Sequence, residues 1–432
     1  MPTQHDSGPA AFEDATYRKV AKRLLPLLIL CYLVAYLDRV NIGFARLQMM
    51  ADLGFSETVY GLGAGIFFIG YFLFEVPSNL ILHRVGARVW IGRIMITWGL
   101  VSASFMFVTT PTMFYVLRFL LGLAEAGFYP GIILYLTYWF PSSRRARMTS
   151  LFMTAIPISG VFGGPLSGWI MATFAGNAGW HGWQWLFLLE ALPSIVLGVV
   201  VIVYLDNSVA AARWLTSDEK ALIQKRLAED VATVAPHASL RAVFADRRIW
   251  LMCIIYFGIA MGQYGLTFWM PVLIQSAGVS GVGMIGLLTA VPYAAAIVGM
   301  LWLGKSADRH RTRRAHVAGT MIAGAVGLSA SVLVGQHTTL SIVCLSIAAI
   351  GVIGSPPLFW NLPTAFLQGT AAAAGIATIN SVANLGGFVS PTVVGALRDL
   401  TGSSTAGMFA VSGVLIVGAL VAWSLPARLV DK

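Results

Sequence analysis

Long apolar runs limit what this chain can fold into more than any other feature of its sequence. Twelve runs reach about the 20 residues that an α-helix needs to cross the hydrocarbon core of a bilayer. They span residues 24–49, 59–82, 89–109, 113–140, 148–174, 183–205, 249–276, 281–304, 315–335, 339–366, 370–398 and 404–425. The chain is 57% hydrophobic and only 11% charged, so most of its surface does not face water. We therefore predict an all-α integral membrane protein with twelve transmembrane helices.

One long polar stretch, residues 206–247, separates the first six runs from the last six. Within it, residues 214–230 are amphipathic, and Thr216 or Ser217 precedes Glu219 at a spacing that suits a helix cap. We therefore expect a short surface helix there. The predicted division is an N-terminal tail at 1–23, a six-helix bundle at 24–205, the linker at 206–247, a second six-helix bundle at 248–425 and a C-terminal tail at 426–432.

The formal net charge of +10 is explained by where the 28 lysines and arginines lie. All but four of them flank the apolar runs on one side of a twelve-span topology. The four exceptions are Arg39, Arg46, Arg118 and Arg398. Because cytoplasmic loops are enriched in lysine and arginine, both termini and the linker are predicted to be cytoplasmic. The basic residues thus mark orientation in a multi-pass membrane protein, and this placement excludes nucleic acid as a partner.

Two arginine-rich turns suggest an internal repeat. Residues 79–88 follow the second run and residues 304–314 follow the eighth, each at a cytoplasmic helix end. The residues expected to act in gating or conformational change are Arg84 and Arg88 in the first turn and Asp308 and Arg309 in the second. Two parallel six-helix halves, related by such a repeat, predict a cavity at their interface near the middle of the bilayer.

Ionisable residues inside spans are rare and point to function by default. This sequence has six, namely Asp38, Arg39, Glu75, Arg118, Glu125 and Glu190. Arg118 and Glu125 are two helical turns apart and share one face, and Gly122 between them leaves room for a ligand or another helix. A guanidinium binds a carboxylate through two hydrogen bonds, and an apolar site favours an uncharged glutamic acid. The pair suits joint binding of an anion and a proton; the alternative is a buried pair that locks this span against a neighbour.

The first span carries a polar and aromatic stripe. Tyr32, Tyr36, Arg39, Gly43 and Arg46 recur at helical spacing, which suits a face that lines a solvated cavity. Asp38 points about 100° away from Arg39, towards Asn41 and a neighbouring helix, where a structural ion pair is its alternative role. For Glu75 we expect pairing with loop arginines, while the sequence does not separate packing from function for Glu190.

Uncharged polar and aromatic residues supply the candidates in the second half. Three prolines at 356, 357 and 363 should break the tenth span, and freed backbone carbonyls are tolerated there only beside protein or water. The candidate ligand contacts are Gln263 and Tyr264 on the seventh span, Trp360 and Asn361 on the tenth, and Asn380 and Asn384 on the eleventh. For any one of these residues, helix packing is an equal alternative.

Several of these motifs resemble a known transporter family. Gly304-x-x-x-Asp308-Arg309-x-x-x-Arg313 is similar to the loop signature of the major facilitator superfamily. The stretch from Tyr36 to Gly43, Arg118 with Glu125, the stretch 182–190 and the stretch 360–366 resemble its anion:cation symporter family. The resemblance implies that Asp38 and Glu125 take part in proton coupling and that Arg39, Arg118 and Tyr71 contact substrate. Tyr36, on the polar stripe of the first span, is a further candidate contact. The first loop departs from the superfamily pattern at Asn79 and His83.

The expected function is proton-coupled import of a small organic anion by alternating access. The anion is a hydroxy-dicarboxylate, a sugar acid or an aromatic carboxylate, and protons serve as coupling ion with no other cofactor. We expect a monomer in the lipid bilayer of a bacterial inner membrane. The alternative is a proton/drug antiporter, although Ile156 and Trp169 replace two glycines of the antiporter pattern in the fifth span. No catalytic motif supports an enzyme.

Overall fold

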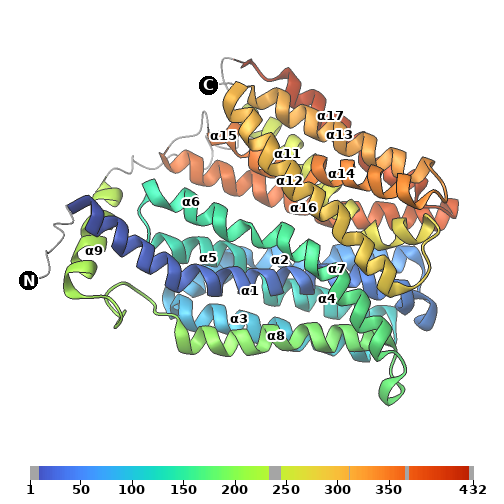
Figure 1. The fold of residues 1–432 in the computed structure, drawn as a ribbon, viewed down its shortest axis with the longest axis horizontal. Coiled ribbons are helices and arrows are strands. Elements are labelled where there is room, and N and C mark those ends of the chain that lie inside the picture. Colours follow the sequence, from blue (N-terminus) through green and yellow to red (C-terminus); the bar gives the residue numbers. More distant parts are fainter. Residues whose placement is uncertain (1–8, 233–244, 311, 365–368, 428–432) are drawn as a thin grey trace, which may run out of the picture.

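Every regular element that we describe is helical, and the long elements follow the apolar runs (Figure 1). The computed structural model describes residues 9–232, 245–310, 312–364 and 369–427. The first half contains α1 (Pro9–Leu53), α2 (Glu57–Val85), α3 (Ala87–Ser104), α4 (Pro111–Glu125), α5 (Phe128–Thr137), α6 (Ser142–Met153), α7 (Ala155–Phe174) and α8 (Gly182–Tyr204). The linker carries α9 (Ser217–Ala232). The second half contains α11 (Arg247–Ser276), α12 (Val282–His310), α13 (Arg313–Leu333), α14 (Thr338–Phe359), α15 (Asn361–Thr364), α16 (Gly369–Thr401) and α17 (Thr405–Ser424).

The predicted all-helical membrane fold is confirmed. Within the described residues, 11 helical segments are long and apolar enough to cross a membrane, with α4–α5, α6–α7 and α14–α15 each counted as one segment. The 33-residue α16 is a further long helix, packed against α2 and α11. Large apolar side chains such as Val203 and Trp302 are 74% and 67% exposed, as expected where a helix faces lipid tails.

Helix boundaries differ from the apolar runs at three places. α1 has 45 residues, about 67 Å at 1.5 Å per residue, so residues 9–23 of the predicted tail belong to a helix that continues beyond the hydrocarbon core. The fourth run is divided at Gly127, whose φ of +85° is a left-handed conformation that ends α4 and starts α5. α14 continues through Pro356 and Pro357 and ends at Phe359, and α15 begins at Asn361, so the predicted break in the tenth run is only a one-residue interruption at Trp360.

The helices form two bundles that meet along one side (Figure 1). Both ends of the described chain and α9 lie at the same end of the molecule, which we call the terminal end; the opposite end is the far end. The bundles pack through α2 against α16 and α7 against α12. Glycines allow this approach, since a Cβ added to Gly61 would lie 2.3 Å from the Pro391 carbonyl oxygen and one added to Gly286 would lie 2.4 Å from that of Gly164.

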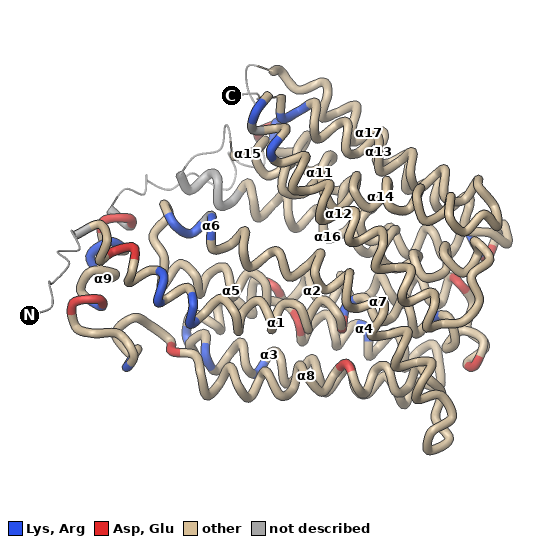
Figure 2. Tube along the Cα trace, viewed as in Figure 1, with Lys and Arg blue, Asp and Glu red and all other residues tan. Residues whose placement is uncertain are grey.

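Lysine and arginine residues are concentrated at the terminal end (Figure 2). Helix α9 is tied there to the first bundle. Its Thr216–Glu219 cap has both reciprocal hydrogen bonds, at 2.8 and 3.3 Å, which confirms the predicted surface helix. Glu219 also pairs with Lys19 of α1 at 2.8 Å, and hydrogen bonds from Ser142 of α6 lower the pKa of Asp230. The linker helix is therefore part of the first bundle.

Candidate functional site

An ion pair between Arg39 of α1 and Glu125 of α4 lies at the centre of the candidate site. Glu125 is the last residue of α4, and the left-handed Gly127 follows it, so the helix break positions its carboxylate. The side chains of Arg39 and Glu125 are 11% and 4% exposed. Two neighbouring charges that are this buried must compensate each other. The pair joins two helices of the first bundle.

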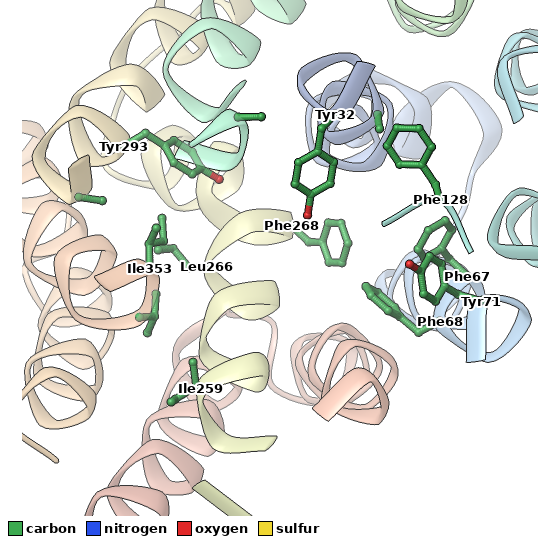
Figure 3. Packing of buried hydrophobic residues seen from close by; sticks show 14 of the residues in the cluster. Tyr32, Phe67, Phe68, Tyr71, Phe128, Ile259, Leu266, Phe268, Tyr293 and Ile353 are labelled. Carbon is green, nitrogen blue, oxygen red and sulfur yellow. The ribbon is translucent and has the colours of Figure 1, made fainter. Parts of the chain in front are cut away.

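Aromatic rings surround the Arg39 guanidinium. Its carbon lies 5.8 Å from the ring centre of Tyr36, 5.4 Å from Phe67 and 5.6 Å from Tyr71, within cation–π range. The field of Arg39 also acts on Tyr264 of α11. Figure 3 shows aromatic side chains from α1, α2, α5 and α11 gathered in this region, among them Tyr32, Phe67, Phe68, Tyr71, Phe128 and Phe268. The structure therefore brings three predicted tyrosines, Tyr36, Tyr71 and Tyr264, to Arg39.

Gln263 connects the two bundles at this level. Its Nε2 donates a hydrogen bond to the Tyr36 hydroxyl at 3.1 Å, across 227 residues of sequence. Tyr264, the next residue, packs edge-on against Phe68 of α2 with ring centres 4.4 Å apart. Both predicted residues of the seventh span thus lie at the interface between the bundles, and Tyr264 also lies near Arg39. Sequence reasoning missed Phe67 and Phe68, which look like ordinary apolar residues of a span.

Arg118 is fully embedded and contacts α2. It is 1% exposed, and it donates to the backbone carbonyls of Gly63 and Ala64, each at 3.1 Å. Its guanidinium carbon lies 5.1 Å from the ring centre of Phe67, which Arg39 also approaches. A Cβ on Gly122 would lie 1.9 Å from the Phe67 carbonyl oxygen. Of the two neighbours proposed for Gly122, a helix therefore takes this position here.

Asp38 faces away from the arginines, as its place on the helix predicts. It is 2% exposed and accepts three hydrogen bonds, from Trp98 Nε1 at 2.9 Å and from the hydroxyls of Ser102 at 3.2 Å and Ser194 at 2.5 Å. These donors come from α3 and α8, so Asp38 lies inside the first bundle. Its hydrogen-bonding partners there are neutral. Sequence reasoning did not find these donors, because they come from two other helices.

The candidate ligand contacts on the tenth and eleventh spans belong to α14–α16 of the second bundle. Trp360 packs edge-on against Tyr256, with ring centres 4.9 Å apart, and Asn361 Nδ2 donates to the Pro357 carbonyl at 3.2 Å. Asn380 and Asn384 are half-buried on α16. The next turn of α16 reaches α2, since a Cβ on Gly387 would meet the Phe68 ring at 2.6 Å.

The predicted gating turns lie at the terminal end. Arg88 donates its backbone N–H to Asn207 Oδ1 at 2.9 Å and its Nε to the Ile202 carbonyl, which ties the start of α3 to the end of α8. Arg84 and Arg309 are exposed. The Asp308 side chain is outside the described part of the structure.

A charged cluster joins the two bundles at the far end. Glu57 pairs with Arg46 of its own bundle and with Arg398 of the other, the latter at 3.2 Å. Asp399 accepts the backbone N–H groups of Glu57 and Thr58 at 3.0 and 2.7 Å, which caps the first turn of α2. We call Arg46, Glu57, Arg398 and Asp399 the far-end cluster. Its acidic members were not singled out from the sequence, where only the arginines were noted at span edges.

Comparison with known proteins agrees with this architecture. The model of the Major Facilitator Superfamily matches residues 28–391. The chain is 52% identical over 419 residues to the putative metabolite transport protein NicT of Pseudomonas putida, covering 97% of this chain and 96% of NicT. It is 49% identical over 410 residues to a putative tartrate transporter of Agrobacterium vitis, covering 95% and 94%. It is 39% identical over 420 residues to a quinolone resistance transporter of Acinetobacter baumannii, covering 97% and 96%.

The fold is also found among solved structures. The crystal structure of a bacterial homologue of the human lysosomal transporter Spinster superimposes with a TM-score of 0.72 over 95% of this chain and 98% of that one, at 16% identity. The helical fold, the family match and the relatives point the same way. The chain belongs to the major facilitator superfamily and is a multi-pass membrane transporter, not an enzyme.

Proposed function

We propose that this chain is a proton-coupled symporter that imports a small organic anion, within the anion:cation symporter family. The observation that carries the proposal is the buried Arg39–Glu125 pair, a cation with a carboxylate partner, which lies close to the contact of Tyr36 with Gln263 between the bundles. The names of two relatives, a metabolite transport protein and a putative tartrate transporter, support a small metabolite. We therefore choose tartrate, a hydroxy-dicarboxylate, as the substrate to test.

The proposed mechanism is an exchange of partners at Arg39. A substrate carboxylate binds the guanidinium through two hydrogen bonds and displaces Glu125. Glu125 is then a buried carboxylate without its partner, a costly state that a proton relieves. The loaded site thus gains one anion and one proton together. The proposed contacts to the rest of the substrate are Tyr36, Tyr71, Gln263, Tyr264, Trp360, Asn361, Asn380 and Asn384, with Arg118 as the second cation.

Asp38 is proposed as a second proton-coupling carboxyl. It lies one residue from Arg39 on α1, and the field of Glu125 acts on it. A change in charge at either carboxyl is therefore felt at the other, although Asp38 lies inside the first bundle.

The contacts between the bundles support alternating access. The far-end cluster and the glycine contacts of α2 with α16 lie from the middle of the bundles to the far end. We propose that the terminal end, with both termini and the linker, is cytoplasmic, because the basic residues are concentrated there (Figure 2). This conformation is then closed to the outside of an inner membrane. The proposed bundles span 24–205 and 248–425, and Arg84, Arg88, Asp308 and Arg309 act in the cytoplasmic loops.

A proton/drug antiporter is the second candidate. The quinolone resistance transporter of Acinetobacter baumannii favours it, and a quinolone also carries a carboxylate that an arginine binds. The two candidates differ in the direction of transport relative to the proton gradient.

Uptake into proteoliposomes tests the proposal. With acid outside, radiolabelled tartrate should accumulate above its external concentration, and a protonophore should abolish the accumulation. Accumulation that persists on a sodium gradient alone would show that sodium, and not the proton, is the coupling ion. Loss of a preloaded quinolone against its gradient, with no tartrate uptake, would establish the antiporter instead.

Substitution of Arg118 should affect both stability and binding. Arg118→Ala removes a large buried side chain and a cation near Glu125, so we expect a loss of about 2–4 kcal/mol of stability and at least a tenfold rise in the Kd for tartrate. Thermal unfolding and isothermal titration of the purified protein measure these effects. Arg118→Lys keeps the charge and should recover part of the binding. A normal Kd with a lowered Tm would assign Arg118 to structure alone.

A further inference from the structure

A second polar cluster is buried inside the first bundle, apart from the Arg39 site. Asp38 and Asn41 lie one turn apart on α1, and Ser194 and Glu190 lie one turn apart on the antiparallel α8. Ser194 donates to Asp38 at 2.5 Å, and Asn41 lies beside Glu190. The two helices therefore face each other through two polar pairs at successive levels of the bundle.

Hydrogen bonding differs sharply between the two carboxyls of this cluster. Asp38 accepts from three donors, two hydroxyls and an indole N–H. Glu190 is 3% exposed and accepts from Ser167 at 2.7 Å through Oε1. Its Oε2 is buried and has no hydrogen-bond partner among the described residues. Both polar atoms of the Asn41 amide, 1% exposed, are likewise unpartnered there.

The charged surroundings of Glu190 contain Asp38 but no compensating arginine among the described residues. The neighbouring elements contribute Asp38 and Asn41 from α1, Trp98 and Ser102 from α3, and Ser167 from α7. Glu125 of α4 adds negative potential at Asp38. Two ionised carboxylates without a cation are expensive in a low-dielectric interior. One of the two carboxyls must therefore be neutral.

We propose that Glu190 holds a proton on Oε2 and donates it in a hydrogen bond to Asn41 Oδ1, while Asp38 is the ionised member of the cluster. This assignment gives a partner to both orphaned oxygens. It also agrees with the donor count, because a carboxylate with three donors, as at Asp38, keeps its charge more easily than Glu190, which has the Ser167 hydroxyl and the neighbouring Asn41 amide. Glu190 is then a proton-binding residue outside the substrate site. It leaves Asp38 as the carboxylate that receives a transported proton, a consequence that rests on the proposed function.

Infrared absorption tests the assignment without any substrate, so its outcome does not depend on whether tartrate is transported. The purified full-length protein at neutral pH should show the C=O stretch of a protonated carboxylic acid, and this band should shift when the chain is labelled with ¹³C-glutamate but not with ¹³C-aspartate. Glu190→Gln should remove the band, whereas Asp38→Asn and Glu125→Gln should keep it. No band in the wild type, a band that follows the aspartate label, or a band unchanged in Glu190→Gln would overturn the proposal.

Thermal unfolding provides a second test through matched variants. The amide of Glu190→Gln has an N–H that donates to Asn41 Oδ1 as the acid O–H does, so its Tm should stay near the wild-type value. Glu190→Ala leaves Asn41 without that donor, and its Tm should fall clearly below that of Glu190→Gln. Equal losses of Tm in the two variants would contradict the hydrogen bond to Asn41. If either variant fails to fold, the isotope shift of the wild-type band still shows whether a glutamic acid holds the proton.

Discussion

Proteoliposomes that contain Glu125→Gln should exchange tartrate across the membrane but fail to accumulate it on a proton gradient. The glutamine cannot take up or release a proton, so the partner exchange at Arg39 no longer carries one. Binding and reorientation remain, because an amide resembles the protonated acid in shape and charge. Counterflow of radiolabelled tartrate measures the exchange, and net uptake with acid outside measures the accumulation.

A carboxyl outside the membrane provides the control for Glu125→Gln. Glu219→Gln removes a carboxylate from the surface helix α9, where it pairs with Lys19, and should accumulate tartrate as the wild type does. Uphill uptake by Glu125→Gln at the wild-type level would refute the coupling role of Glu125. Loss of both exchange and uptake in a folded Glu125→Gln carrier would indicate that the carboxylate serves binding instead.

Arg39→Ala should raise the Kd for tartrate by about 10- to 100-fold. Hydrogen bonds to charged groups contribute about 1.5–3 kcal/mol, and each 1.4 kcal/mol is a factor of ten in affinity. Arg39 is expected to supply two such bonds to one carboxylate, but it gives up its pair with Glu125 to do so, and the net loss is therefore about that of one bond. Arg39→Lys keeps the positive charge but loses the planar pair of donors, so its Kd should lie between that of the wild type and that of Arg39→Ala. Isothermal titration at constant pH measures all three proteins.

The single Arg39 substitution also leaves Glu125 buried without its partner, which by itself disturbs the site. The double variant Arg39→Ala with Glu125→Gln removes this charge and should regain thermal stability without regaining affinity. If the double variant binds tartrate as tightly as the wild type, Arg39 is not the anchor of the carboxylate, and the proposed mechanism fails.

Much of the fold follows from the sequence, because transmembrane helices are specified locally. A run of about 20 apolar residues satisfies its own backbone in lipid, so the runs predict nearly all of the long helices. The opposite directions of Asp38 and Arg39 follow equally from the 100° step of a helix.

The pairing of charges across helices could not be predicted in the same way. The sequence suggests Glu125 beside Arg118, two turns away on one helix, but the closest partner of Glu125 is Arg39, 86 residues away. The helix break at Gly127 and the packing of Gly122 against α2 decide this. These contacts join segments that are distant in the sequence, so they cannot be predicted from hydropathy. The donors to Asp38 and the cap that Asp399 gives to α2 are non-local for the same reason.

The far-end cluster has a consequence for how the carrier responds to voltage. Each bundle supplies one positive and one negative member, Arg46 with Glu57 in the first and Arg398 with Asp399 in the second. If the bundles separate there, as alternating access requires, Glu57 can keep Arg46 as its partner, and the cluster members on each bundle remain electrically neutral as a pair. A membrane potential acts on moving net charge, at about 2.3 kcal/mol per charge per 100 mV. It should therefore change the free energy of opening at the far-end cluster very little. Any voltage dependence of transport should then arise from the substrate and the protons that travel with it.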